Sequence, residues 1–251
     1  MDKVIDVQRL YGEIEGVQIL NDVSFSALRG EVTAIIGGSG SGKTTIMRHL
    51  LGLNPVQRGY VSVLGRNLSD ITEEEQRKLY QEMGVFFQDG ALLNSMSVAE
   101  NVALPLKHQG NLPDELTDDI VRMKLRLVNL EEAYYLYPSQ LSGGMLKRAA
   151  LARSIAMDPP LLFCDEPGAG LDPVSLESLD RLILDLKNLL GMSIILITHE
   201  ISSIMRTANR IIFLDKGTVL FEGSTREALK SDIPEIADFF AAIMKKQGGT
   251  A

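Results

Sequence analysis

The sequence has little that would suit a protein outside the cell or inside a membrane. A single cysteine among 251 residues cannot form an internal disulfide, which favours a reducing compartment. The N-terminal segment MDKVIDVQRL lacks the apolar core of a signal peptide. No stretch approaches roughly 18 uninterrupted apolar residues, so the chain is not expected to span a membrane by itself.

Basic residues are also outnumbered. The chain carries 25 Lys and Arg against 33 Asp and Glu, a formal net charge of −8. A general nucleic-acid binder needs clustered Lys and Arg to contact phosphates, so no nucleic-acid partner is expected. Hydrophobic residues make up 45% and charged residues 23%, which is an ordinary globular composition. That composition excludes a disordered, collagen-like or coiled-coil chain.

Short β-branched runs alternate with helical stretches. Runs typical of strands fall at 4–7, 32–36, 60–64, 85–87, 161–164, 194–198 and 210–214. Helices are predicted after Gly42 and over 72–83. A further stripe recurs at helical spacing at Ile120, Met123, Leu127 and Leu130. The alternation predicts an α/β fold with a mainly parallel sheet covered on both faces, into which a helical segment is inserted.

A glycine-rich loop lies between an apolar strand and a helical run. The pattern GxxxxGK[ST] is matched by Gly37, Gly38, Ser39, Gly40, Ser41, Gly42, Lys43 and Thr44. The glycines let backbone N–H groups turn around a phosphate, and the helix N-terminus adds partial positive charge. Lys43 supplies a charge to the β- and γ-phosphates, and Thr44 offers a hydroxyl to Mg²⁺. The loop therefore predicts that the chain binds a nucleotide and Mg²⁺.

Two other segments complete the chemistry. The apolar strand 161–166 ends in Asp165, which suits a Mg²⁺ ligand acting through water, and Glu166, which could polarise the attacking water. A second glycine-containing helix start is formed by Leu141, Ser142, Gly143, Gly144 and Met145. A chain that binds one nucleotide needs only one phosphate-binding helix start, yet this sequence contains two. The simplest explanation is a dimer in which each of these loops serves the partner's nucleotide.

Together these motifs resemble, in order and spacing over nearly the whole chain, the ATPase subunits of ABC transporters. The resemblance implies a single P-loop ABC ATPase domain over 1–251, with ATP and Mg²⁺ as cofactors and a second copy as an ATP-dependent partner. It further implies an α/β nucleotide-binding core at 1–88 and 159–251, an antiparallel β part, and a helical subdomain at 89–158.

The family's roles transfer by position. Tyr11 resembles the aromatic residue that stacks on adenine, with an ordinary strand tyrosine as the alternative. Gln88 resembles the lid-loop glutamine that senses Mg²⁺, and His199 resembles the switch histidine that contacts the γ-phosphate. Asp172 resembles the dimer-contacting loop. The implied catalytic residues are Glu166, His199 and Gln88, the implied metal residues are Thr44, Gln88 and Asp165, and the implied ATP-binding residues are Tyr11 and Gly37 through Thr45. His49 and His108 match no motif and are interpreted as structural or surface residues.

Two segments narrow the resemblance to one group of ABC transporter ATPases. Residues 86–93, FFQDGALL, and 98–106, VAENVALPL, together with Met145, resemble the Mla-type, Mce-associated phospholipid transport ATPases. This resemblance implies an ATPase on the cytoplasmic face of the bacterial inner membrane that maintains outer-membrane lipid asymmetry. Its implied partners are a permease dimer, a lipid-binding Mce-domain subunit and often a small STAS-domain protein. Ala91, Leu92 and Leu93 would then suit docking of a permease helix, with simple core packing as the alternative.

Other functions remain open at this point. One is the ATPase of another importer, such as one for amino acids. Others are a non-transport ABC protein acting on DNA or ribosomes, and a nucleotide-binding module without catalysis. The presence of Lys43, Asp165, Glu166 and His199 argues against the last of these.

The assignment of Glu166 yields a direct prediction. Glu166→Gln should bind ATP, hydrolyse it at least about tenfold more slowly, and accumulate as an ATP-bound dimer, because the base that polarises water is lost. Phosphate release and light scattering with Mg-ATP measure both effects. Hydrolysis at the normal rate would remove Glu166 from this role.

Overall fold

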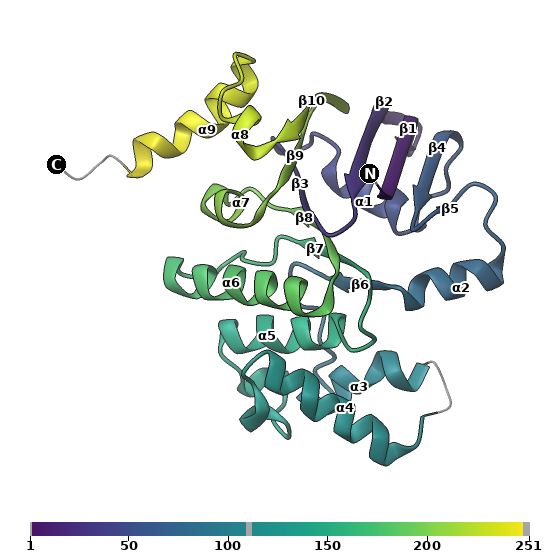
Figure 1. The fold of residues 1–251 in the computed structure, drawn as a ribbon, viewed down its shortest axis with the longest axis vertical. Coiled ribbons are helices and arrows are strands. Elements are labelled where there is room, and N and C mark those ends of the chain that lie inside the picture. The colour runs from purple at the N-terminus through teal and green to yellow at the C-terminus, as the bar shows by residue number, and fades with distance from the viewer. Residues whose placement is uncertain (1, 109–111, 248–251) are drawn as a thin grey trace. The chain divides into compact units, whose positions relative to one another are not determined.

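The computed structural model describes residues 2–108 and 112–247, with side chains of the last helix described as far as Ala241. The chain divides into two compact units. The first comprises Met1–Gln76 and Ile195–Ala251, and the second comprises Arg77–Ile194. Figure 1 shows the elements of each unit, coloured along the chain.

The first unit contains an antiparallel sheet in the order β2-β1-β4-β5. Its strands are β1 (Lys3–Ile14), β2 (Val17–Leu28), β4 (Arg58–Val63) and β5 (Arg66–Asn67). Beside it, β9 (Arg210–Asp215) pairs in parallel with β3 (Val32–Gly37) and antiparallel with β10 (Thr218–Ser224). Every residue of β3 is buried, which explains its continuous β-branched and apolar sequence.

The helices of the first unit cover β3 and β9. They are α1 (Lys43–Leu50), α7 (Ile201–Thr207), α8 (Thr225–Ala228) and α9 (Pro234–Gln247). Ile236 and Phe240 of α9 are buried in a cluster with Ile36 and Phe213. Phe239 stacks edge-on against Phe213, with 5.5 Å between ring centroids. The apolar face of α9 therefore packs on the chain's own core.

The second unit places helices around a short parallel pair of strands. β6 (Met83–Phe86) and β7 (Leu161–Asp165) run parallel, with Met83 opposite Leu161. The helices are α3 (Val98–His108), α4 (Asp114–Leu127), α5 (Gly143–Ser154) and α6 (Pro173–Leu190), with the short turns η1 (Glu131–Ala133) and η2 (Pro138–Gln140). α3, α4 and α5 pack on one another (Figure 1). α2 (Glu73–Gln81) and β8 (Ser193–Ile197) each span the boundary between the units.

All seven predicted strands form, but the sequence gives no signal for three others. β2, β5 and β10 carry Asn, Asp, Glu or Arg on faces that stay partly exposed, so their apolar runs are short. β1 is also longer than the predicted segment, and it continues through Gly12. None of the helices in the described part of the chain combines the length and hydrophobicity that a membrane span requires.

The helix predicted from the spacing of Ile120, Met123 and Leu127 forms as α4, but one residue of that stripe faces outward. Met123 is 45% exposed, whereas Val121, Lys124 and Leu125 are buried. The buried Lys124 is paired, since its ammonium lies 2.5 Å from a carboxylate oxygen of Asp158. A lysine thus occupies a place on the inner face that hydrophobic spacing alone would give to an apolar residue.

The packing of α9 can be tested against a matched surface site. Ile236→Ala should lower the free energy of unfolding by about 3 kcal/mol, because it leaves a cavity in a fully buried position. Leu229→Ala, at a residue that is 48% exposed, should cost far less. Denaturant unfolding of both variants gives the comparison, and equal losses would contradict the packing of α9 on the core.

Candidate active site

The phosphate-binding loop is held in shape by glycines that no other residue could replace. Gly37 has φ 148°, and a Cβ there would lie 2.1 Å from the carbonyl oxygen of Leu214 on β9. Gly42 has φ 106°, and a Cβ there would lie 2.7 Å from Leu20. Around Gly38 and Gly40 the space is open. The loop is therefore fixed at both ends and free of side-chain atoms at its middle, as a phosphate cradle requires.

Lys43 turns back over the loop. Its ammonium donates to the carbonyl oxygens of Gly37 at 2.9 Å and Gly38 at 2.8 Å. α1 begins at Lys43 with no acidic residue in its first turn, so the positive end of the helix is not neutralised. Thr44 is exposed, whereas Thr45 is buried. The geometry fits the triphosphate of a nucleotide at this helix end.

Tyr11 lies on β1 in the same unit. The guanidinium of Arg58 stands 3.7 Å from the centroid of its ring, in cation–π geometry. The residue that follows, Gly12, lies against the buried side chain of His49. Tyr11, Gly12 and His49 border a cavity of about 270 Å³, also lined by Glu13, Arg48 and Gln57. His49, which the sequence leaves without a motif, is thus a structural residue that touches the Tyr11 segment.

His199 also belongs to the first unit. It follows β8 and its side chain is 64% exposed, with Nε2 3.8 Å from Oε1 of Glu200. Thr198 accepts a hydrogen bond from the backbone N–H of Glu200 at 3.1 Å, which shapes the turn between β8 and α7.

In the second unit, Gln88 lies in an exposed loop after β6 that is fastened to α5. The Lys147 ammonium donates to the carbonyl oxygen of Gln88. Arg153 donates to the carbonyl oxygens of Gly90 at 2.6 Å and Ala91 at 2.7 Å. Burial lowers the pKa of Lys147, while the charges of Asp89 and Glu166 oppose that shift. Sequence reasoning missed both basic residues, because a bond to a distant backbone carbonyl leaves no pattern in the sequence.

Asp165 and Glu166 end the buried strand β7. Both are half-buried, and Glu166 has φ 45°, which is uncommon for a residue with a side chain. Its carbonyl oxygen accepts from the N–H of Ala169 at 3.1 Å, so a tight turn holds this backbone. Strain of this kind is frequent at active sites. Cys164, next to Asp165, is fully buried, and burial raises the pKa of its thiol.

The Leu141–Met145 motif and the Asp172 loop lie together. Ser142 caps α5, its hydroxyl accepting from the N–H of Met145 at 3.3 Å. Asp172 caps α6 through the N–H groups of Val174 and Ser175, and its hydrogen bonds with Ser175 lower the pKa of the carboxyl group. Gly144 and Leu171 line a common cavity of about 240 Å³.

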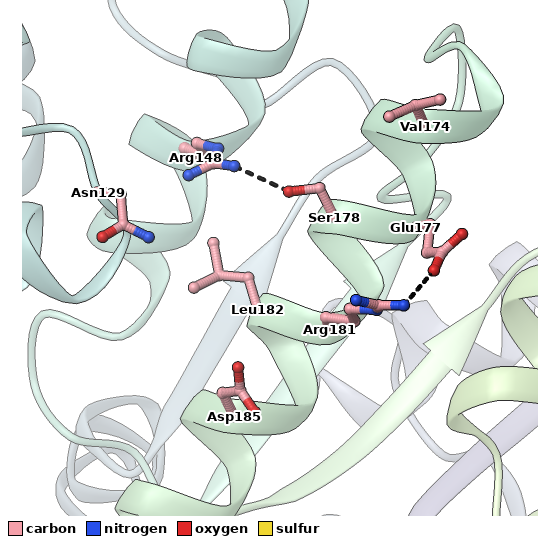
Figure 2. Close-up of a pocket in the computed structure, with 8 residues that line it drawn as sticks. All are labelled: Asn129, Arg148, Val174, Glu177, Ser178, Arg181, Leu182 and Asp185. Atoms are coloured by element: carbon pink, nitrogen blue, oxygen red, sulfur yellow. Dashed lines mark hydrogen bonds and ion pairs between the residues drawn. The ribbon is translucent and has the colours of Figure 1, made fainter.

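A larger pocket is lined by Arg148 of α5 and by several residues of α6. Figure 2 shows Arg148 of α5 reaching Ser178 of α6, at 3.0 Å, and Arg181 paired with Glu177. Arg148 also donates to the carbonyl oxygen of Val128 at 3.0 Å. Arg148 thus ties together the helices that begin at Ser142 and Asp172. The pocket, of about 420 Å³, contains no residue of the predicted site.

The predicted residues are divided between the two units. The first unit holds Tyr11, the phosphate loop and His199; the second holds Gln88, Asp165, Glu166, the Leu141–Met145 motif and Asp172. In the described part of the chain, no three His, Cys, Asp or Glu side chains form a cage for a metal ion. A Mg²⁺ at a triphosphate needs few protein ligands, since phosphate oxygens and water supply the rest.

Comparison with known proteins identifies the family. The ABC transporter family model matches residues 20–169. Methionine import ATP-binding protein MetN of Brucella abortus is 36% identical over 98% of this chain and 69% of its own length. This chain belongs to the ABC transporter ATP-binding family. It is accordingly an ATPase.

Other ABC proteins agree with this assignment. The intermembrane phospholipid transport system ATP-binding protein MlaF of Escherichia coli K12 is 36% identical over 90% of this chain and 84% of its own length. Among solved structures, cbiO1 of Clostridium perfringens, part of the ABC transporter complex cbiONQ, has a TM-score of 0.85 and 27% identity over 96% of this chain and all of its own. The dimeric ATP-binding cassette MJ0796 bound to ADP and Pi has a TM-score of 0.78 and 28% identity over 88% of this chain and 98% of its own. The predicted P-loop ABC ATPase fold is confirmed.

His49 gives this unit a pH dependence that can be measured. Burial lowers the pKa of the His49 imidazole below its ordinary value of 6.5. As the pH falls through 6.5, the unfolded chain binds a proton that the folded chain does not, so stability is complete above 6.5 and declines below it. His49→Leu should remove up to about 1.4 kcal/mol per pH unit of that decline. Denaturant unfolding between about pH 8 and 5 tests this, and parallel curves for the two proteins would contradict it.

Proposed function

We propose that this chain is the ATP-hydrolysing subunit of a phospholipid transporter of the Mla type, peripheral on the cytoplasmic face of the bacterial inner membrane. The resemblance of residues 86–106 and the similarity to MlaF support the substrate class. The observation that carries the proposal is an apolar groove in the second unit, lined by part of that same segment.

The groove has a volume of about 760 Å³. Four of its lining residues belong to the segment 86–106 that resembles the Mla-type ATPases: Phe87, Ala91, Leu104 and Pro105. Met157, which follows α5, adds further apolar surface. Phe87 is 42% exposed, so its ring is accessible to a docking helix. An apolar groove beside helices suits a docking helix, so we assign it to the permease. Of the patch predicted at Ala91, Leu92 and Leu93, only Ala91 lines the groove.

The loop after Gln88 connects this groove to α5. Ala91 lines the groove, and its carbonyl oxygen is bound by Arg153. Gln88 is bound in turn by Lys147, whose charge interacts with Glu166. A helix that presses on the groove would therefore shift the loop that contains Gln88. This chain of contacts supports a mechanical link between the permease and ATP hydrolysis.

In this proposal each predicted site residue has a role in binding or hydrolysing ATP. By the family resemblance, Lys43 and the loop amides would hold the triphosphate, Tyr11 would stack on adenine, and Thr44, Gln88 and Asp165 would be the residues for Mg²⁺, which would neutralise phosphate charge. Glu166 polarises the attacking water, and His199 contacts the γ-phosphate. Leu141–Met145 completes the site of a second copy in an ATP-dependent dimer, and Asp172 lies beside it at the dimer contact. A Mce-domain subunit and a STAS-domain protein complete the proposed complex.

An importer of amino acids is the second candidate. MetN is as similar in identity as MlaF, so the observations favour neither substrate by similarity alone. Purification of the chain in mild detergent with its native partners separates the two. A Mce-domain partner with bound phospholipid supports the first function, whereas a periplasmic amino-acid receptor would support the second.

Coupling through the groove can be tested with a charged side chain. Phe87→Glu places a carboxylate where the docked helix would exclude water, and an unpaired charge is strongly disfavoured in such an apolar contact. It should abolish permease-stimulated hydrolysis while leaving ATP binding by the free subunit intact. Leu189→Glu, at a position on α6 that is 65% exposed and does not line the groove, is the matched control.

ATPase assays of the reconstituted complex, with and without the permease, measure the effect. Equal stimulation of Phe87→Glu and Leu189→Glu would contradict docking in the groove.

A further inference from the structure

His49 joins two parts of the nucleotide site within the first unit. It lies on α1, the helix that begins at Lys43, about 9 Å along the helix from that residue. Its side chain is 3% exposed. The ring reaches β1 at Gly12, the residue directly after Tyr11. One side chain thus spans from the phosphate-binding helix to the segment that carries the aromatic residue.

The contact at Gly12 is close. A Cβ at residue 12 would lie 2.8 Å from Nε2 of His49 and 3.1 Å from Cδ1 of Leu20. The first distance is too short for any real side chain, so the imidazole fills the space that a glycine leaves free. The position of the ring therefore limits how near β1 comes to α1 at Tyr11.

The sheet does not set this position by itself. The pairing of β1 with β2 shifts register on both sides of Gly12. The pairing of β1 with β4 shifts between Gln8 and Tyr11. Such irregularities interrupt the ladder of hydrogen bonds that would otherwise fix a strand. Tyr11 still pairs with Arg58 of β4 and Gly12 with Leu20 of β2, but between these irregularities the pairing needs support from packing, which His49 supplies.

The imidazole ring acts as an uncharged spacer between α1 and β1. Neither ring nitrogen makes a hydrogen bond of ordinary geometry to any residue that the structure describes, although the backbone of Asn54 lies nearby. The charged groups around it are Glu13 on β1, Arg48 on α1, and Arg58 of β4 over the Tyr11 ring. Burial lowers the pKa of His49, which keeps the imidazole neutral near pH 7. A buried, neutral ring in this position contributes chiefly its volume.

We propose that His49 is a positioning residue that holds Tyr11 at a set distance from the phosphate loop and so sets how much the adenine base adds to the binding of ATP. The proposal rests on the assignment of Tyr11 as the adenine-stacking residue. In this arrangement the phosphates bind at the start of α1, and the base is placed by the same helix further along.

The test compares ATP with inorganic tripolyphosphate, which has phosphates and no base. Dissociation constants of both are measured for the purified chain and for His49→Ala, His49→Leu and Tyr11→Ala. His49→Ala should weaken ATP binding about tenfold, the scale of a lost aromatic–base stack, and leave tripolyphosphate binding unchanged. His49→Leu, which restores neutral volume, should stay within about twofold of the unmodified chain for both ligands.

Each other outcome is decisive. Equal weakening of both ligands in His49→Ala, or no weakening of either, overturns the proposal. If Tyr11→Ala does not change the ratio of the two constants, the stacking role of Tyr11 fails first. If Tyr11→Ala lowers ATP binding selectively and His49→Ala does not, only the role of His49 fails.

A second variant guards against loss of folding in His49→Ala, which thermal unfolding would reveal. Gly12→Ala adds a methyl group at the same contact from the other side, so it should also weaken ATP selectively. The double variant Gly12→Ala with His49→Ala should recover part of that loss, since the clash with Nε2 is gone. A loss in the double variant as large as the sum of both single losses overturns the proposal as well.

Discussion

The close approach of backbone to backbone around the phosphate loop is the constraint on which the first unit depends. Gly37 passes so near the carbonyl oxygen of Leu214 that no side chain fits, and Gly217 passes equally near the carbonyl oxygen of Ile19. The N–H of Gly217 also donates to the carbonyl oxygen of Ser41 at 3.1 Å. The loop is thus held in place by the backbone of β9, of the turn that follows it and of β2. A loop that must present bare N–H groups to a ligand has to be held by such neighbours, because it has no side chains to hold itself.

In the second unit the corresponding constraint is the attachment of the Gln88 loop to α5. Three carbonyl oxygens of the loop are bound by two cations of one helix. The same helix begins at Ser142 and is tied to α6 by Arg148. α5 is therefore in contact with the groove loop at one side and with the start of α6 at the other. Buried cations suit this task, because charge-assisted bonds to carbonyl oxygens hold a loop more firmly than neutral ones.

The sequence predicts the parts of this protein whose chemistry is local. The glycine pattern 37–44 and the carboxylates at the end of 161–166 specify both their backbone and their surroundings, and the structure has them on the expected elements. Long-range contacts leave no such signal. Nothing near Lys147 or Arg153 indicates which carbonyl oxygens they bind, and nothing near Lys124 indicates that Asp158 allows it to be buried. β2 and β10 could not be predicted either, because strands with one exposed face carry polar residues that interrupt the apolar pattern.

His49 shows how far a motif-based reading extends. A histidine outside every motif is read as structural, and its burial agrees with that interpretation. Yet a structural residue on the helix that binds phosphates, in contact with the segment that bears Tyr11, constrains both at once. Motifs identify the groups that touch a ligand, whereas the distances between those groups are set by residues such as this one. Since backbone packing fixes the phosphate loop, the side chain that sets the distance between α1 and β1 can change how much the base adds to nucleotide binding.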